Sequence, residues 1–135
     1  MNLKDLLVEE KLVTVDYPGC EGFSINLAFL GKKVLGNLRT KATITRIDKK
    51  SRQPVEEIDS ELFTKLYIDS VVKGWSGLKY KYLVNLLPID ISSVDEEAEL
   101  EYSVENARVL LKDSGEFDTW VAEIVGDLQN FTKAK

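Results

Sequence analysis

Residues 67–88 read YIDSVVKGWSGLKYKYLVNLLP, and this stretch decides how the rest of the chain folds. It starts inside an amphipathic pattern that predicts a helix over residues 60–73, with Asp59 as the N-cap. Gly74 is expected to end this helix in the left-handed conformation, which glycine adopts without a steric penalty. Trp75 then stands at the helix exit, either as a plug packed on the core or as an exposed anchor for a partner.

Further helices are predicted downstream of this stretch. The first is short, over residues 78–87, and ends at Pro88 because proline cannot continue a helix. Ser103 is the predicted N-cap of the next helix, and Ser114 is the predicted N-cap of the closing helix over residues 115–131. Apolar residues recur at helical spacing in the closing helix, so one of its faces is expected to be buried.

The N-terminal part carries strand signals instead. Residues 12–17 (LVTVDY) and 23–29 (FSINLAF) alternate apolar and polar side chains with the period of two that is typical of strands. The proline and two glycines between these runs favour a turn, so a β-hairpin is predicted. Residues 1–10 are expected to form a short helical turn or a loose lead-in to the hairpin.

Residues 32–47 are predicted as a helix, although Gly36 and the β-branched run at 43–45 disfavour this assignment. The predicted fold class is therefore α+β, a mainly α-helical single domain of residues 1–135 with an N-terminal β-hairpin. Its parts are the β-hairpin over residues 12–30, a helical part over residues 32–131 and a frayed tail over residues 132–135.

The composition narrows the classes of function. The chain has 135 residues, of which 44% are hydrophobic, so it can bury a core as one domain. Histidine is absent and Cys20 is the single cysteine, which excludes Ser-His and Cys-His catalytic pairs and a zinc site built from cysteines. We therefore expect no enzyme activity, no cofactor and no bound metal. No apolar run approaches the length of about 20 residues that a membrane helix needs, so no membrane partner is expected.

The charges are segregated along the chain, which carries a net charge of −5. Residues 32–52 hold eight lysines and arginines and one acid, and residues 90–101 hold six acids and no base. Such segments can pair within one molecule or between copies. Contacts between copies predict a homo-oligomer, with self-association through Lys49, Lys50, Arg52, Glu96 and Glu97.

Other uses of the charged segments are less favoured. The basic segment, residues 32–52, could bind nucleic acid phosphates, but it has no interleaved aromatic residue and the whole chain is acidic. The acidic segment, residues 90–101, lacks the spacing of a calcium loop. A solvated surface is the simpler interpretation of both segments, and a small nucleic-acid-binding regulator remains an alternative.

Four stretches, taken in order, resemble the tail assembly chaperones of long-tailed (siphovirus-like) bacteriophages. The first two are FSINLAFL, residues 23–30, followed by a basic segment, and ELFTKLYIDSVVKGWSGL, residues 61–78. The last two are YSVENARVLL, residues 102–111, and FDTWVAEIVGDLQNF, residues 117–131. Each stretch is weak alone, and their order and spacing carry the resemblance.

The resemblance implies a function in phage tail morphogenesis. Chaperones of this kind bind the tape measure protein, keep it soluble and help recruit tail tube protein in the host cytoplasm, and they are absent from the mature virion. Partner contacts are predicted at Trp75, Leu78, Tyr80 and Tyr82, with Trp120 and Phe131 as second choices. A structural head–tail connector or tail component of the virion is the main alternative.

Overall fold

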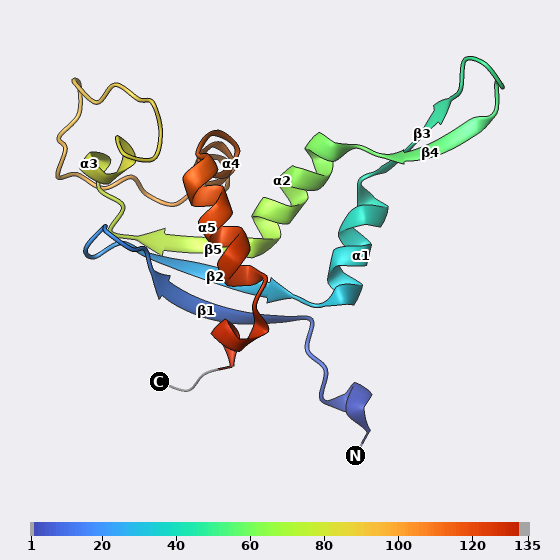
Figure 1. Cartoon of the computed structure of the whole chain (residues 1–135), viewed down its shortest axis with the longest axis horizontal. Helices are drawn as coiled ribbons and strands as arrows, with labels where there is room; N and C mark the ends of the chain where they lie inside the picture. The colour runs from blue at the N-terminus through green and yellow to red at the C-terminus, as the bar shows by residue number, and fades with distance from the viewer. Residues whose placement is uncertain (1, 133–135) are drawn as a thin grey trace.

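A three-stranded antiparallel sheet forms the centre of the molecule (Figure 1). The computed structural model describes residues 2–132. The strands lie in the order β1 (Glu10–Asp16), β2 (Ser24–Leu30) and β5 (Val72–Ser76), so β2 is the central strand. Three helices pack near this sheet, namely α2 (Ser60–Val71), α4 (Val104–Asp113) and α5 (Gly115–Val125). The remaining elements are η1 (Leu3–Asp5), α1 (Lys32–Lys41), β3 (Thr43–Ile47), β4 (Pro54–Ile58), α3 (Tyr80–Leu83) and η2 (Leu128–Phe131).

The predicted N-terminal β-hairpin is confirmed. Strands β1 and β2 pair in antiparallel register, with Val13 opposite Leu27 and Val15 opposite Ile25. The backbone N–H of Tyr17 donates to the Phe23 carbonyl at 2.9 Å and closes the hairpin end. The turn between them contains two glycines with φ of 83°, a conformation that glycine adopts without strain.

The prediction that Gly74 ends a helix is wrong. Helix α2 ends at Val71, and the chain continues directly into β5, where Gly74 lies opposite Asn26 of β2. A Cβ atom at Gly74 would lie 3.1 Å from the side-chain nitrogen (Nδ2) of Asn26, so the glycine allows the two strands to pack closely. The left-handed glycine of this stretch is Gly77, with φ of 77°.

The predicted helix over residues 32–47 is also wrong in its second half. Helix α1 ends at Lys41, and the β-branched run that follows forms β3, which pairs with β4. The mainly α-helical fold class is therefore wrong as well, because 41% of the residues are helical and 24% lie in strands of two antiparallel sheets. Strands β3, β4 and β5 all lie within the part predicted to be helical, because strand pairing overrides local helical spacing there.

The three predicted N-caps are correct, whereas the helix predicted to start at residue 78 starts at Tyr80. The side chains of Asp59, Ser103 and Ser114 accept hydrogen bonds from the backbone N–H groups of the first turns of α2, α4 and α5. The helix ends differ from the prediction, because α5 ends at Val125 and α3 contains only four residues. Of the predicted frayed tail over residues 132–135, residues 133–135 lie outside the described residues.

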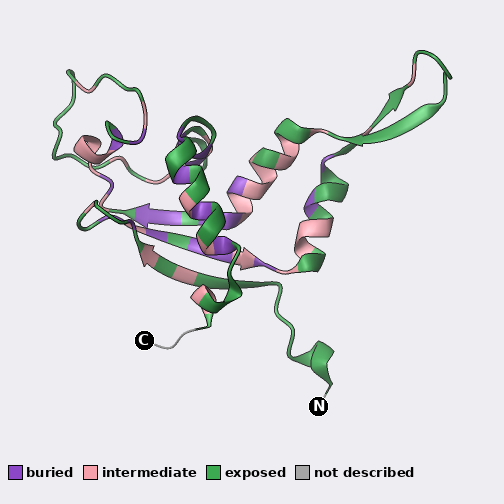
Figure 2. Cartoon of the chain, viewed as in Figure 1, coloured by how far each residue is buried: buried purple, intermediate pink, exposed green. Residues whose placement is uncertain are grey.

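One hydrophobic cluster joins the sheet to the helices (Figure 2). Phe23 and Phe117 are fully buried, with their rings 6.3 Å apart. The ring of Tyr17 lies 5.5 Å from Phe117 and makes an edge contact with Trp120 at 4.8 Å. These aromatic side chains hold α5 against the turn end of the N-terminal hairpin.

The junction between α4 and α5 supports a prediction on stability. Ser114 is 2% exposed, and its Oγ accepts a hydrogen bond from the Phe117 N–H at 3.2 Å. We expect Ser114→Ala to lower the free energy of unfolding by about 1 kcal/mol or more, because the cap of α5 is lost and the buried Phe117 N–H loses its acceptor. Chemical denaturation measures the loss, and the control Ser103→Ala at an exposed cap should cost less.

Candidate partner-binding groove

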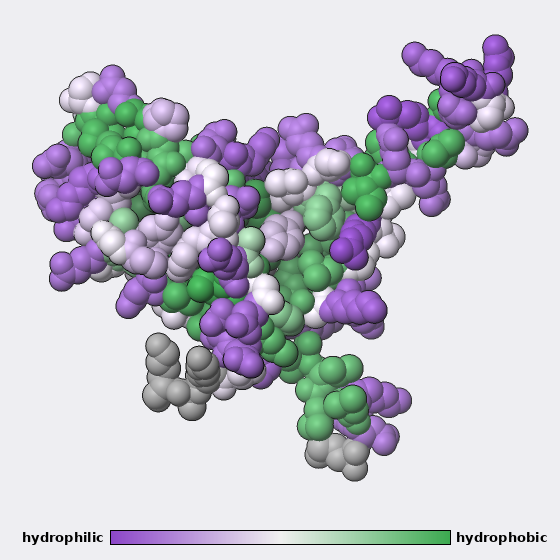
Figure 3. Space-filling view, viewed as in Figure 1, coloured by the Kyte–Doolittle hydropathy of each residue, from purple (hydrophilic) through white to green (hydrophobic). Residues whose placement is uncertain are grey.

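The N-terminal segment, residues 3–9, exposes more apolar surface than any folding role requires. The exposed fractions of Leu3, Leu6, Leu7 and Val8 are 74%, 61%, 70% and 59%. The segment leaves the sheet at one end of the molecule, and Figure 3 shows it as a continuous hydrophobic surface. Exposed apolar patches of this kind mark sites of association with other molecules.

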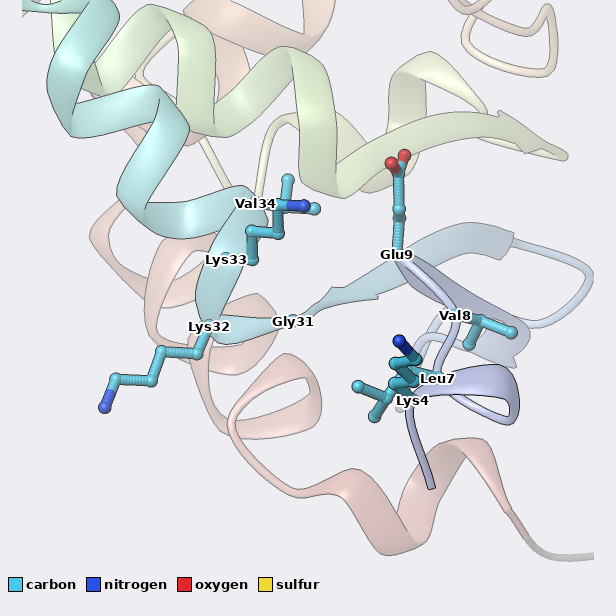
Figure 4. Close-up of a pocket in the computed structure, with 8 residues that line it drawn as sticks. All are labelled: Lys4, Leu7, Val8, Glu9, Gly31, Lys32, Lys33 and Val34. Carbon is cyan, nitrogen blue, oxygen red and sulfur yellow. The ribbon is translucent and has the colours of Figure 1, made fainter. Parts of the chain in front are cut away.

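A groove lies between this segment and the start of α1 (Figure 4). It has a volume of about 680 Å³. The backbone N–H of Gly31 donates to the Glu9 carbonyl at 3.1 Å, which fixes the floor where the two parts of the chain meet. The lining residues are Lys4, Leu7, Val8, Glu9, Gly31, Lys32, Lys33 and Val34.

A second hollow adjoins the first on the other side of the segment. Its volume is about 240 Å³, and it shares Leu7, Val8 and Gly31 with the groove. Phe29 of β2 and Leu128 of η2 add further apolar surface to it. The side chains of Leu7 and Val8 therefore have open space on both sides. A surface that receives side chains of another molecule needs such space.

The rim of the groove is mainly basic. Lys4, Lys32 and Lys33 contribute cations, and Glu9 contributes one acid. The N-terminus of α1 adds the positive end of a helix dipole at the same place. An apolar floor with a basic rim suits an amphipathic helix whose apolar stripe is bordered by acidic residues.

The structure places two of the predicted partner contacts in the core. Trp75 is 9% exposed and donates its indole N–H to the Leu100 carbonyl at 2.9 Å, and Leu78 is fully buried. Trp75 is thus a packed residue of β5, as the plug interpretation required of its side chain. Neither side chain offers surface to a partner in this structure.

The other four predicted contacts are half-buried. The Tyr82 hydroxyl donates to the Glu21 carbonyl at 2.7 Å, and Tyr80 begins α3. Trp120 packs on Tyr17, and the Phe131 ring lies 5.7 Å from that of Phe29. These residues come from separate parts of the fold, and their role in partner binding stays a prediction.

The sequence reasoning missed the groove because its two walls are distant in the sequence. The available signal was the apolar run at residues 6–8, which lies outside any strong helical or strand pattern. An apolar run without a predicted partner element is either buried by the rest of the fold or exposed for association. Only the structure shows that it is exposed.

Other chemical features of the described residues are few. Within residues 2–132, no group of three or more Cys, Asp or Glu side chains is placed to hold a metal ion. Burial, with the nearby Glu116 carboxylate, raises the pKa of the Cys20 thiol, so the thiol stays protonated at neutral pH. Among these residues, no helix is both long and apolar enough to cross a membrane.

Comparison with known families identifies the origin of the chain. The model of a family described as YdaY prophage protein matches residues 32–135, which is most of the sequence. The chain belongs to this prophage protein family. It is therefore a phage-derived protein. The match begins at the first residue of α1, so it includes one wall of the groove, while the N-terminal segment and the β1–β2 hairpin lie before it.

The family description gives an origin and does not name a biochemical activity. No curated protein and no solved structure matches the chain. The function of this member of the YdaY prophage family must therefore be argued from its surface.

Proposed function

We propose that this protein is a phage tail assembly chaperone that binds the tape measure protein and keeps it soluble. The phage origin and the order of the four sequence stretches support the context. The observation that carries the proposal is the apolar groove beside the N-terminal segment. A chaperone for a long helical client needs an exposed apolar surface and no catalytic group.

The groove supports binding by the helix-in-groove mode. In this mode an amphipathic helix places its apolar stripe in a hydrophobic groove, with anchors at positions i, i+3, i+4 and i+7. Leu7 and Val8 form one wall, and Val34 contributes to the other. The lysines of the rim favour helices whose apolar stripe is flanked by acidic residues.

The proposed chaperone acts in the host cytoplasm and leaves before the virion is complete. By holding the tape measure protein in a soluble form, it also presents that protein to tail tube subunits. No enzyme activity and no cofactor are needed for these steps, since binding energy alone keeps the client from aggregating.

Co-expression tests this proposal. The tape measure protein encoded in the same prophage is produced with and without the present protein, and the soluble fraction of each culture is compared. We expect the tape measure protein to be insoluble alone, soluble when co-expressed, and recovered with a tagged copy of this protein. An insoluble tape measure protein in both cultures, with the tagged protein recovered alone, would contradict the proposal.

The main alternative, a structural connector or tail component, is separated by mass spectrometry of purified virions. A chaperone should be present in lysates of induced cells and absent from the particles. A stoichiometric amount in the particles would assign the protein to the virion and remove the chaperone proposal. The basic residues along α1, β3 and the following loop favour neither the chaperone nor the virion component.

A further inference from the structure

We infer that the β3–β4 hairpin of one copy docks on the acidic end of a second copy, so that the protein associates head to tail. We name residues 43–58 the arm and residues 84–101 the acidic end. The inference concerns contacts between copies of this chain, and it stands or falls independently of the tape measure proposal.

The arm is a two-stranded hairpin that is mostly exposed to solvent. It projects from the body next to α1, and almost every residue in it is exposed (Figures 1 and 2). An isolated two-stranded hairpin is at best marginally stable in water. The arm nevertheless has an ordered tip, because the Asp48 carboxylate accepts hydrogen bonds from the Ser51 N–H at 3.1 Å and from its hydroxyl at 2.8 Å.

One face of the arm carries three apolar side chains together with Thr43, Thr45 and Glu56. Side chains of directly paired residues lie on the same face, so Ile47 and its partner Pro54 share a face with Ile58. Ile47 is 61% exposed and Ile58 is 47% exposed. On the opposite face, Arg46 pairs with Glu57 across the strands at 2.6 Å. The arm therefore presents exposed apolar side chains at both ends of this face, with the Thr45–Glu56 pair between them.

The tip of the arm is basic. Lys49, Lys50 and Arg52 are exposed there, and Asp48 is the one acid of the connecting loop. Within residues 2–132, these three cations form no salt bridge. Ile47 and Pro54 lie next to this cluster of cations, so a complementary surface combines apolar side chains with carboxylates.

The acidic end has these properties. It exposes Val84, Ile89 and Val94 at 43%, 40% and 41%, and Figure 3 shows a hydrophobic patch there among hydrophilic side chains. Its six acids outnumber the two nearby lysines, Lys79 and Lys81. The apolar patch matches the arm in chemical character, and its acidic border matches the basic tip in charge.

The two lysines form salt bridges with only one of these six acids among the described residues. Lys81 and Lys79 contact the Glu97 carboxylate at 2.8 and 3.1 Å, and their hydrogen bonds hold its pKa below the ordinary value. Glu97 is thus engaged inside its own copy, whereas Glu96 forms no salt bridge among the described residues. Glu96 and Glu101 are exposed, and they are the carboxylates we assign to the contact.

The positions of the two surfaces determine the kind of assembly. Viewed with the longest axis horizontal, the arm lies at one end of the molecule and the acidic end lies at the other (Figure 1). In this arrangement, the arm of one molecule cannot contact the acidic end of the same molecule. Contacts between two different surfaces are heterologous, so repetition gives a ring or an open filament rather than a closed two-fold dimer.

Sedimentation velocity of the full chain tests the inference. We expect the wild-type protein to form larger species as its concentration rises. These species should dissociate when NaCl is raised from about 0.1 M to about 1 M, which shortens the Debye length from about 10 Å to about 3 Å. The variant Lys49→Glu/Lys50→Glu/Arg52→Glu should remain monomeric at low salt. A monomeric wild type at low salt, or unchanged association of the variant, would overturn the inference.

A mixing experiment excludes misfolding as the reason for lost association. Glu96→Lys/Glu101→Lys reverses the acceptor, and it should also be monomeric alone. Mixed with the arm variant, it should restore large species, because the acidic arms then meet basic acceptors and the basic arms meet acidic ones. Absence of any recovery on mixing would contradict head-to-tail docking. The matched control Arg39→Glu/Lys41→Glu/Lys112→Glu changes the same number of exposed cations outside the arm, the acidic end and the groove, and it should associate like the wild type.

Discussion

Gly77→Ala is expected to lower the free energy of unfolding by about 3–5 kcal/mol, a large part of the roughly 5–15 kcal/mol by which a domain is ordinarily stable. A Cβ at this position would lie 1.9 Å from the Gly22 carbonyl oxygen and 2.7 Å from its carbonyl carbon. Both are backbone atoms of the hairpin turn, so no flexible side chain can move aside. The φ of 77° adds strain for any residue with a side chain. Chemical denaturation, or the soluble yield if the variant does not fold, measures the effect.

Two glycine variants separate the clash from the backbone strain. Gly22→Ala introduces a side chain at φ of 83° with nothing within 4 Å, so strain alone should cost about 1–2 kcal/mol. Gly36→Ala, inside α1 and also in open space, should stabilise the protein by about 0.5–1 kcal/mol. A loss at Gly77 no larger than that at Gly22 would contradict the close approach of the two turns.

Leu7→Asp/Val8→Asp is expected to weaken binding of the tape measure protein by about 100-fold or more. Each of these side chains contributes about 1.5–3 kcal/mol when it is fully buried, and a factor of ten in affinity corresponds to about 1.4 kcal/mol. Both side chains are exposed in the free protein, so its thermal unfolding should change little. A pull-down titration on the co-expressed client measures the loss.

The matched control replaces two exposed valines elsewhere. Val104 and Val109 of α4 are 44% and 47% exposed, and neither lines the groove. Val104→Asp/Val109→Asp should therefore bind the client like the wild type. Equal loss in both double variants would assign the effect to the two added negative charges rather than to the groove.

Local signals predicted the elements that depend on local chemistry. The caps at Asp59, Ser103 and Ser114 are correct because each side chain accepts a hydrogen bond from a backbone group three residues away. The β1–β2 hairpin is correct because its alternation and its turn glycines lie within one short stretch. Both kinds of signal are complete within about twenty residues of sequence.

The elements that were predicted wrongly depend on distant partners. Strand β5 exists because Gly74 and Trp75 pair with β2, which lies about fifty residues earlier in the chain. Local spacing over residues 60–73 could not distinguish the end of a helix from the start of a buried strand. Strand β3 likewise follows from pairing with β4, although its β-branched residues gave a partial signal.

The candidate surfaces show the same division. The basic and acidic segments were visible in the sequence, because charge is a property of composition. Their placement at opposite ends of the molecule was not, since it depends on how α1 and the sheet orient the arm. The groove was harder still to predict, because Val8 and Val34 line it together only when β1 and β2 have paired.

Hydrogen–deuterium exchange of the purified protein, with and without the tape measure protein, is the most direct test of a client-binding groove. We predict slower exchange on binding at residues 3–9 and at the start of α1, with little change in α4. Protection confined to other elements, or no protection at a saturating concentration of the tape measure protein, would contradict the account.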